Sequence, residues 1–178
     1  MLLRAIAILS LAGAAGAACA AEELSVQASR RDGAIEVRAQ ALVTAALDTV
    51  RDTLIDYDRL PAFIPGMKSS RVVARNGNVS VVEQVGEARF LFFSFPIEVT
   101  VQSTEQPPEA IDIRALKGSF RRLEGGYRLR QLPDGVIEIR WTGLLEPDFA
   151  LPPLLGEVLM RSTMEEQFLG MVREIERR

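Results

Sequence analysis

The sequence contains no histidine, and its single cysteine, Cys19, lies near the amino terminus. Histidine is the commonest general base and metal ligand in proteins, and the cysteine thiolate is a strong nucleophile. Any catalysis by the rest of the chain would therefore use Asp, Glu, Lys, Arg, Tyr or Ser side chains. One cysteine cannot form a disulfide within the chain. We expect neither a metal site nor a bound cofactor.

The chain also lacks an excess of positive charge. Its formal net charge is −3, whereas proteins that bind phosphate backbones carry clusters of Lys and Arg, so nucleic acid is not an expected partner. With 178 residues, of which 48% are hydrophobic and 25% charged, the composition is typical of a globular protein. No repeat or linker indicates a second domain.

Residues 1–20 have the pattern of a secretory signal peptide. Arg4 supplies the positive charge, residues 5–11 form an apolar segment, and Ala18-Cys19-Ala20 is a small-residue cleavage site. We therefore predict export to the periplasm and a mature domain of residues 21–178. An alternative is a lipoprotein anchored through Cys19, although Gly16 stands where such sites usually carry Leu. No later segment has the roughly 18 apolar residues that a membrane span requires.

The first part of the mature chain predicts two strands and two short helices. Residues 24–29 and 34–43 alternate in polarity around Asp32-Gly33, a dipeptide typical of hairpin turns. Residues 45–55 have apolar side chains at helical spacing. A second short helix is expected to begin near Asp58 and to end at Pro65-Gly66.

From Lys68 onward the polarity alternates with a period of two, which predicts an antiparallel meander. The expected strands are residues 70–75, 79–85, 89–101, 110–115, 119–131 and 136–145. One face of these strands is apolar and aromatic, and the other is polar. Gly125 and Gly143 on the apolar face have no side-chain volume, which favours a cavity over a filled core.

A long helix is expected from Pro152 to Arg178, because two prolines suit the first turn of a helix and none follows. Its broad apolar face would cover the apolar face of the sheet. Arg161 is placed near the middle of that face, with Glu157 and Glu165 one turn away. Two interpretations follow: Arg161 binds a ligand head group in the cavity, or the three residues form a solvated ion-pair ladder.

Several segments, together with the order of the elements, resemble the START-like superfamily, also called SRPBCC. Residues 56–65 match the pattern D-Y-x-x-L-P-x-F-x-P of its polyketide cyclase/dehydrase and coenzyme Q-binding branch. Residues 82–86, 118–129 and 145–147 are also similar to this branch. The resemblance spans essentially the whole mature chain.

The resemblance implies an α+β helix-grip fold, in which a curved antiparallel sheet wraps around a long C-terminal helix and two short helices follow the first strand. It also implies a hydrophobic cavity between sheet and helix for a lipid, a quinone or a polyketide-like molecule. The candidate ligand-binding residues are Tyr57, Phe63, Met67, Phe93, Phe95, Tyr127, Trp141, Arg161, Met164 and Phe168.

Three functions are compatible with this sequence. The favoured one is a periplasmic carrier that binds a hydrophobic ligand without transforming it, with transient contact with a membrane. The second is a cyclase or dehydratase that uses a carboxylate such as Glu83, Glu146 or Asp148 as a base, although no nucleophile–base spacing stands out and no catalytic residue is assigned. The third is an interaction module with a filled core.

Overall fold

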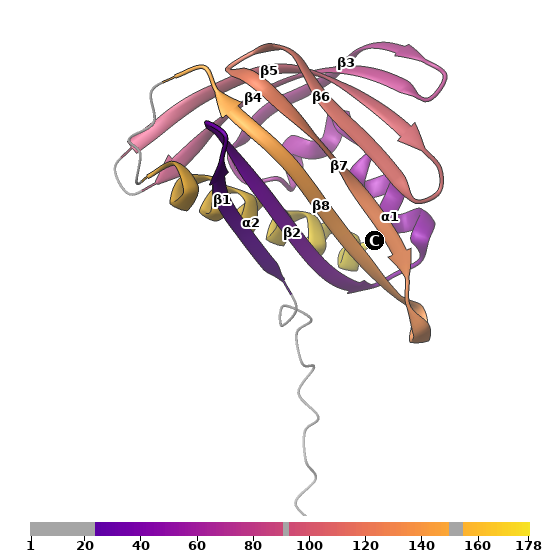
Figure 1. The fold of residues 1–178 in the computed structure, drawn as a ribbon. Coiled ribbons are helices and arrows are strands. Elements are labelled where there is room, and N and C mark those ends of the chain that lie inside the picture. Colours follow the sequence, from indigo (N-terminus) through magenta and orange to yellow (C-terminus); the bar gives the residue numbers. More distant parts are fainter. Residues whose placement is uncertain (1–23, 91–92, 150–154) are drawn as a thin grey trace, which may run out of the picture.

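The structure is a computed structural model that describes residues 24–90, 93–149 and 155–178. An eight-stranded antiparallel sheet curves around one long helix, as the sequence predicts (Figure 1). The proposed signal peptide lies outside the described residues.

All eight strands belong to one sheet with the order β1-β2-β8-β7-β6-β5-β4-β3. The strands are β1 (Ser25–Arg31), β2 (Ala34–Thr44), β3 (Met67–Asn76), β4 (Val79–Phe90), β5 (Phe93–Gln106), β6 (Ala110–Gly118), β7 (Phe120–Gln131) and β8 (Val136–Pro147). Strands β3 to β8 form the expected meander, and β2 pairs with β8 to join the N-terminal hairpin to it.

One predicted boundary is wrong, because the chain turns later than expected between the fourth and fifth strands. Arg89 belongs to β4 and not to β5. Gly86 remains inside β4, where a Cβ atom would lie only 2.6 Å from the carbonyl oxygen of Gly66. The Glu87 amide donates a hydrogen bond of 2.8 Å to that oxygen. Gly86 therefore does not form a turn. Because it has no side chain, the carbonyl group of Gly66, just before β3, can lie close to β4.

Four helical elements accompany the sheet in the described residues, namely α1 (Leu47–Leu54), the 3₁₀ turns η2 (Tyr57–Ala62) and η3 (Pro133–Gly135), and α2 (Gly156–Arg177). The predicted start of the last helix at Pro152 lies outside the described residues. The buried side chains of α2 include Leu159, Phe168, Met171 and Ile175. Within the described residues, no helix is long and apolar enough to cross a membrane.

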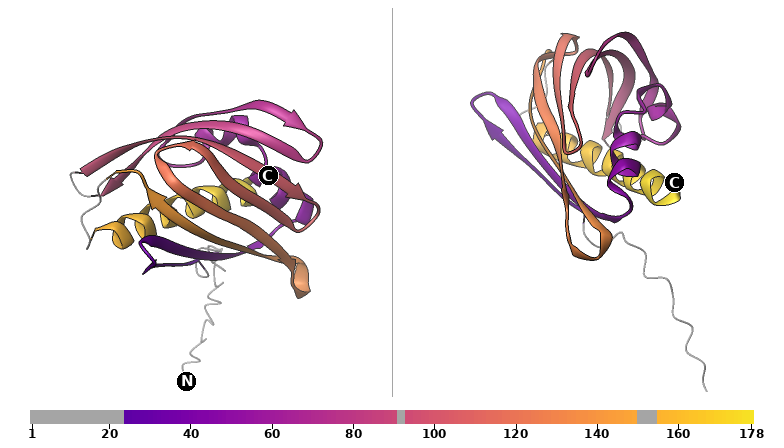
Figure 2. Two further views of the ribbon diagram at one scale, coloured as in Figure 1. Left: turned by 45° about the horizontal axis from the view of Figure 1, so that its top comes forward. Right: turned by 90° about the vertical axis from the view of Figure 1, so that its right-hand side faces the viewer.

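Helix α2 crosses the concave face of the sheet (Figure 2). Its backbone comes nearest to the sheet at β2 and β1, and then at β4. The main core joins side chains of α2, β2 and β8, and it includes Val37, Ile139, Phe168 and Met171.

Glu174 anchors the C-terminal end of α2, although the helical wheel places it on the polar side. Its side chain is 7% exposed and accepts hydrogen bonds from Arg177 (2.7 and 2.8 Å) and Arg178 (2.9 Å). Arg178 also donates to Asp56, at 2.6 Å, next to η2. These hydrogen bonds to Arg177 and Arg178 lower the pKa of Glu174 to about 2. The ion pairs connect the helix end to the segment before β3.

We predict that Glu174→Gln lowers the free energy of unfolding by about 1–3 kcal/mol near neutral pH, because charge-assisted hydrogen bonds are lost. A carboxylate with a lowered pKa in the folded state stabilises the protein above the unfolded-state pKa, and this contribution disappears as the pH falls. Urea unfolding of the wild type should therefore show a loss of stability between about pH 4.5 and pH 2 that the variant lacks.

Glu176→Gln is the matched control, because Glu176 lies on the same helical turn and is exposed. The control should unfold as the wild type does. Equal stability of the two variants at neutral pH would contradict the anchoring role of Glu174.

Candidate ligand-binding cavity

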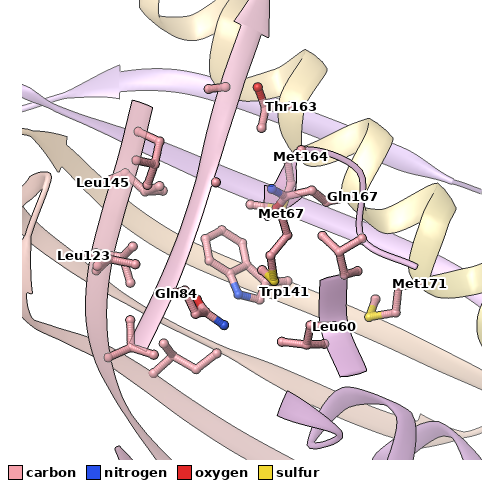
Figure 3. A pocket seen from close by; sticks show the side chains of 18 of the residues that line it. Leu60, Met67, Gln84, Leu123, Trp141, Leu145, Thr163, Met164, Gln167 and Met171 are labelled. Atoms are coloured by element: carbon pink, nitrogen blue, oxygen red, sulfur yellow. The ribbon is translucent and has the colours of Figure 1, made fainter. Parts of the chain in front are cut away.

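A cavity of about 240 Å³ lies between the inner face of the sheet and α2 (Figure 3). Strands β4 to β8 supply most of one wall, and the opposite wall comes from α2 and η2. On α2 the lining residues are Met160, Thr163, Met164, Gln167, Phe168 and Met171. This spacing of three and four residues places them on one side of the helix.

Trp141 covers part of the sheet surface inside the cavity. A Cβ atom on Gly143 would overlap the indole ring, and one on Gly125 would lie 3.1 Å from its Cζ2 atom. Gly125 and Gly143 are directly paired across β7 and β8, so together they make a flat place for the ring. The two glycines therefore accommodate the indole, which corrects the expectation that they simply leave empty volume.

Methionine is concentrated at this site. The chain has five methionines, and Met67, Met160, Met164 and Met171 all line the cavity. Methionine side chains are flexible and polarizable, so they adapt to ligands of irregular shape. The lining can thus follow the shape of a bound molecule.

The cavity also contains uncharged polar groups. The Tyr57 hydroxyl donates a hydrogen bond of 2.8 Å to the Ser103 hydroxyl. Among the described residues, the Tyr127 hydroxyl and the side chains of Gln84 and Gln167 have no hydrogen-bond partner. The Thr163 hydroxyl is buried and also unpaired. The cavity therefore has spare hydrogen-bonding capacity.

Burial raises the pKa of both cavity tyrosines. For Tyr57 the hydrogen bond to Ser103 opposes the effect of burial. For Tyr127 burial is the main cause, the nearby Tyr57 adds to it, and the pKa lies well above the ordinary value. Both phenols are therefore protonated near neutral pH.

Glu87 is the one charged residue among those that line the cavity. It follows Gly86 in β4, so alternation along the strand directs its side chain away from the inner face. The carboxylate contacts Lys68, at 3.1 Å, and Arg89. The interior of the cavity is thus apolar with neutral polar groups.

Six of the ten predicted residues line this cavity. They are Tyr57, Met67, Tyr127, Trp141, Met164 and Phe168. Phe63 lies outside it, with the Arg178 guanidinium 5.9 Å from its ring centroid at the end of α2. Phe95 is also outside the lining and stacks on Phe149 with ring centroids 5.5 Å apart. The side chain of Phe93 lies outside the described part of the structure.

Arg161 is not among the residues that line the cavity. Its side chain is exposed, whereas its neighbour Met160 is buried and lines the cavity. In the described structure Arg161 forms no ion pair with Glu157 or Glu165, and Glu157 instead accepts a hydrogen bond from the backbone of Arg30.

The sequence-based list omitted several lining residues, including Leu60, Gln84 and Gln167. A signal for Gln167 was present, because it falls on the helical face shared by Met160, Met164 and Met171. Gln84 has no comparable signal, since polar residues are common in strands that have one wet face.

The three carboxylates considered as catalytic bases are not lining residues. Glu83 pairs with Arg71 at 3.1 Å, and Asp148 pairs with Arg121 at 2.7 Å. Arg121 also lies 3.9 Å from Glu146. Within the described residues, no group of His, Cys, Asp and Glu side chains could hold a metal ion.

A sequence model of the family described as "Polyketide cyclase / dehydrase and lipid transport" matches residues 43–173. The chain belongs to this family. The match covers both walls of the cavity. No curated protein sequence matches this chain significantly.

Solved structures with the same fold support this assignment. A STAR-related lipid transfer protein from Xanthomonas axonopodis is 15% identical, with a TM-score of 0.72 over 87% of this chain and 94% of that protein. A START superfamily protein from Mycobacterium smegmatis is 17% identical, with a TM-score of 0.69 over 80% and 97%. The Zhui aromatase/cyclase from a Streptomyces species is 15% identical, with a TM-score of 0.66 over 79% and 90%. The family member described here therefore has the START-like fold.

We predict that Gly143→Ala displaces the indole of Trp141 into the cavity. The added methyl group should lower the free energy of unfolding by about 1–3 kcal/mol through overpacking. It should also weaken binding of the neutral dye N-phenyl-1-naphthylamine and shift the emission maximum of Trp141, the single tryptophan.

Thr142→Ala is the matched control, because Thr142 is the neighbouring residue of β8 and is exposed. The control should keep the dye affinity of the wild type. Wild-type dye affinity and emission in Gly143→Ala would show that Trp141 does not rest on Gly143.

Proposed function

We propose that this protein is a carrier that binds a hydrophobic small molecule in the cavity and does not transform it. The candidate ligands are a lipid, a quinone or a polyketide-like molecule. The observation that carries the proposal is the apolar, uncharged interior of a 240 Å³ cavity between sheet and helix. Transfer of apolar ligand surface from water into such a site contributes about 25 cal/mol per Å².

The comparisons are compatible with this proposal and with one alternative. The family description includes lipid transport as well as cyclase and dehydrase activity. The structural relatives likewise include a lipid transfer protein and an aromatase/cyclase. The residues of the cavity must therefore decide between binding and catalysis.

The chemistry of the cavity favours binding. A cyclase or dehydratase needs an acid or base in reach of its substrate. The Glu87 carboxylate is already paired with Lys68 and Arg89. The Tyr127 phenol faces the ligand space, but its raised pKa makes it a weak acid near neutral pH. Neutral polar groups can orient a ligand without reacting with it.

The proposed site of action is the periplasm. This part of the proposal rests on the sequence of residues 1–20, which has the pattern of an export signal. A soluble carrier in that compartment would sequester a hydrophobic molecule or transfer it between donors and acceptors.

Native mass spectrometry of protein purified from the periplasm tests the proposal. We expect an intact mass above that of residues 21–178 alone, and organic extraction should release a hydrophobic molecule of the corresponding mass. The Gly143→Ala variant should carry less of this molecule, because the indole occupies its space.

An unliganded protein that also excludes N-phenyl-1-naphthylamine would contradict the carrier function and favour a module with a filled core. Conversion of an added polyketide-like substrate by the purified protein would favour the cyclase.

A further inference from the structure

Two hydrogen-bond donors lie side by side on the wall of the cavity. Tyr127 in β7 and Trp141 in β8 are directly paired across the two strands, so both side chains project from the inner face. Both residues line the cavity. The Tyr127 ring also contacts Phe168 of α2, with centroids 6.2 Å apart, which holds the phenol between sheet and helix.

Neither donor is used within the described structure. The Tyr127 hydroxyl and the Trp141 indole N–H have no hydrogen-bond partner, in contrast to the Tyr57 hydroxyl, which is bonded to Ser103. Trp141 is only 6% exposed. A donor in the cavity without a partner in the protein can bond to a ligand, and a hydrogen bond of this kind contributes about 0.5–1.5 kcal/mol, so a molecule that supplies an acceptor gains affinity. An indole N–H can only donate, and therefore the matching group must be an acceptor.

The charge of the cavity limits which acceptor fits. No Lys or Arg belongs to the described lining residues. An ionised carboxylate or phosphate would lose its hydration without gaining a counter-charge, which is strongly unfavourable. A carbonyl oxygen accepts two hydrogen bonds and is uncharged, so it can be desolvated at a much lower cost.

We propose that Tyr127 and Trp141 form a donor pair that selects uncharged lipophilic ligands carrying a carbonyl oxygen and discriminates against carboxylates and phosphates. This inference rests on the proposed carrier function and specifies its ligand class. The cavity volume of about 240 Å³ suits a single chain or a small ring system better than a two-chain phospholipid. The methionines of α2 and Met67 would surround the apolar remainder of the ligand.

Three probes with the same alkyl chain test the selection. They are 2-undecanone, which has a carbonyl group, undecane, which has no acceptor, and decanoate, in which a carboxylate replaces the methyl ketone. Trp141 is the single tryptophan and lines the cavity, so its fluorescence reports binding of each probe. We expect the wild type to bind the ketone about 3- to 10-fold more tightly than the alkane, and decanoate more weakly than both.

Tyr127→Phe retains the ring and removes the hydroxyl. It should lower the affinity for 2-undecanone about 3- to 10-fold and leave that for undecane within twofold, which reduces the ketone-to-alkane ratio. Thr142→Ala is the matched control, since Thr142 is exposed and is not a lining residue, so its hydroxyl is removed outside the cavity. Only the ratio of affinities is compared, and in Thr142→Ala it should stay as in the wild type. Circular dichroism and the thermal midpoint establish that both variants are folded.

An unchanged ketone-to-alkane ratio in Tyr127→Phe would overturn the donor pair, as would decanoate binding as tight as that of the ketone to the wild type. Both results would leave the carrier function intact. Failure of all three probes to bind would overturn the carrier function, and this inference with it.

Discussion

The structure depends on how one helix covers the inner face of an eight-stranded sheet. Eight strands about 4.8 Å apart span roughly 34 Å, whereas a helix with its side chains is only about 10 Å wide. The sheet curves, and α2 comes nearest to it at β1, β2 and β4. The inner side chains of β5 to β8 therefore face space that the backbone of α2 does not fill, and the cavity lies there. Its position follows from the packing of these two elements.

The side chains of the lining determine what this space can do. Trp141 lies flat over Gly143 and beside Gly125, which keeps a large aromatic surface on the wall and out of the centre. The four methionines supply an adaptable surface, and the neutral groups around them offer hydrogen bonds without charge. These properties are the basis for the proposed preference for an uncharged lipophilic molecule.

Sequence reasoning predicts what depends on local periodicity. The alternation in β7 and β8 identifies their inner faces, and the helical spacing of Met164 and Phe168 identifies the face of α2 that meets the sheet. Contacts between distant segments are not predictable in this way. Gly86 lies close to Gly66 inside β4, where the sequence predicts a break between two strands. The exposure of Arg161 is likewise not predictable from the helical wheel, since Phe168 lies seven residues later on the same helical face and is buried.

The central claim is that an apolar cavity exists between the sheet and α2 in the folded protein. Apolar cavities of this kind take up xenon, which needs neither charge nor hydrogen bonds to bind. A crystal structure of the delipidated protein under xenon pressure tests the claim most directly. We predict xenon density bounded by Trp141, Met164 and Phe168. Absence of xenon, with the Trp141 indole or the α2 methionines filling this space, would contradict it.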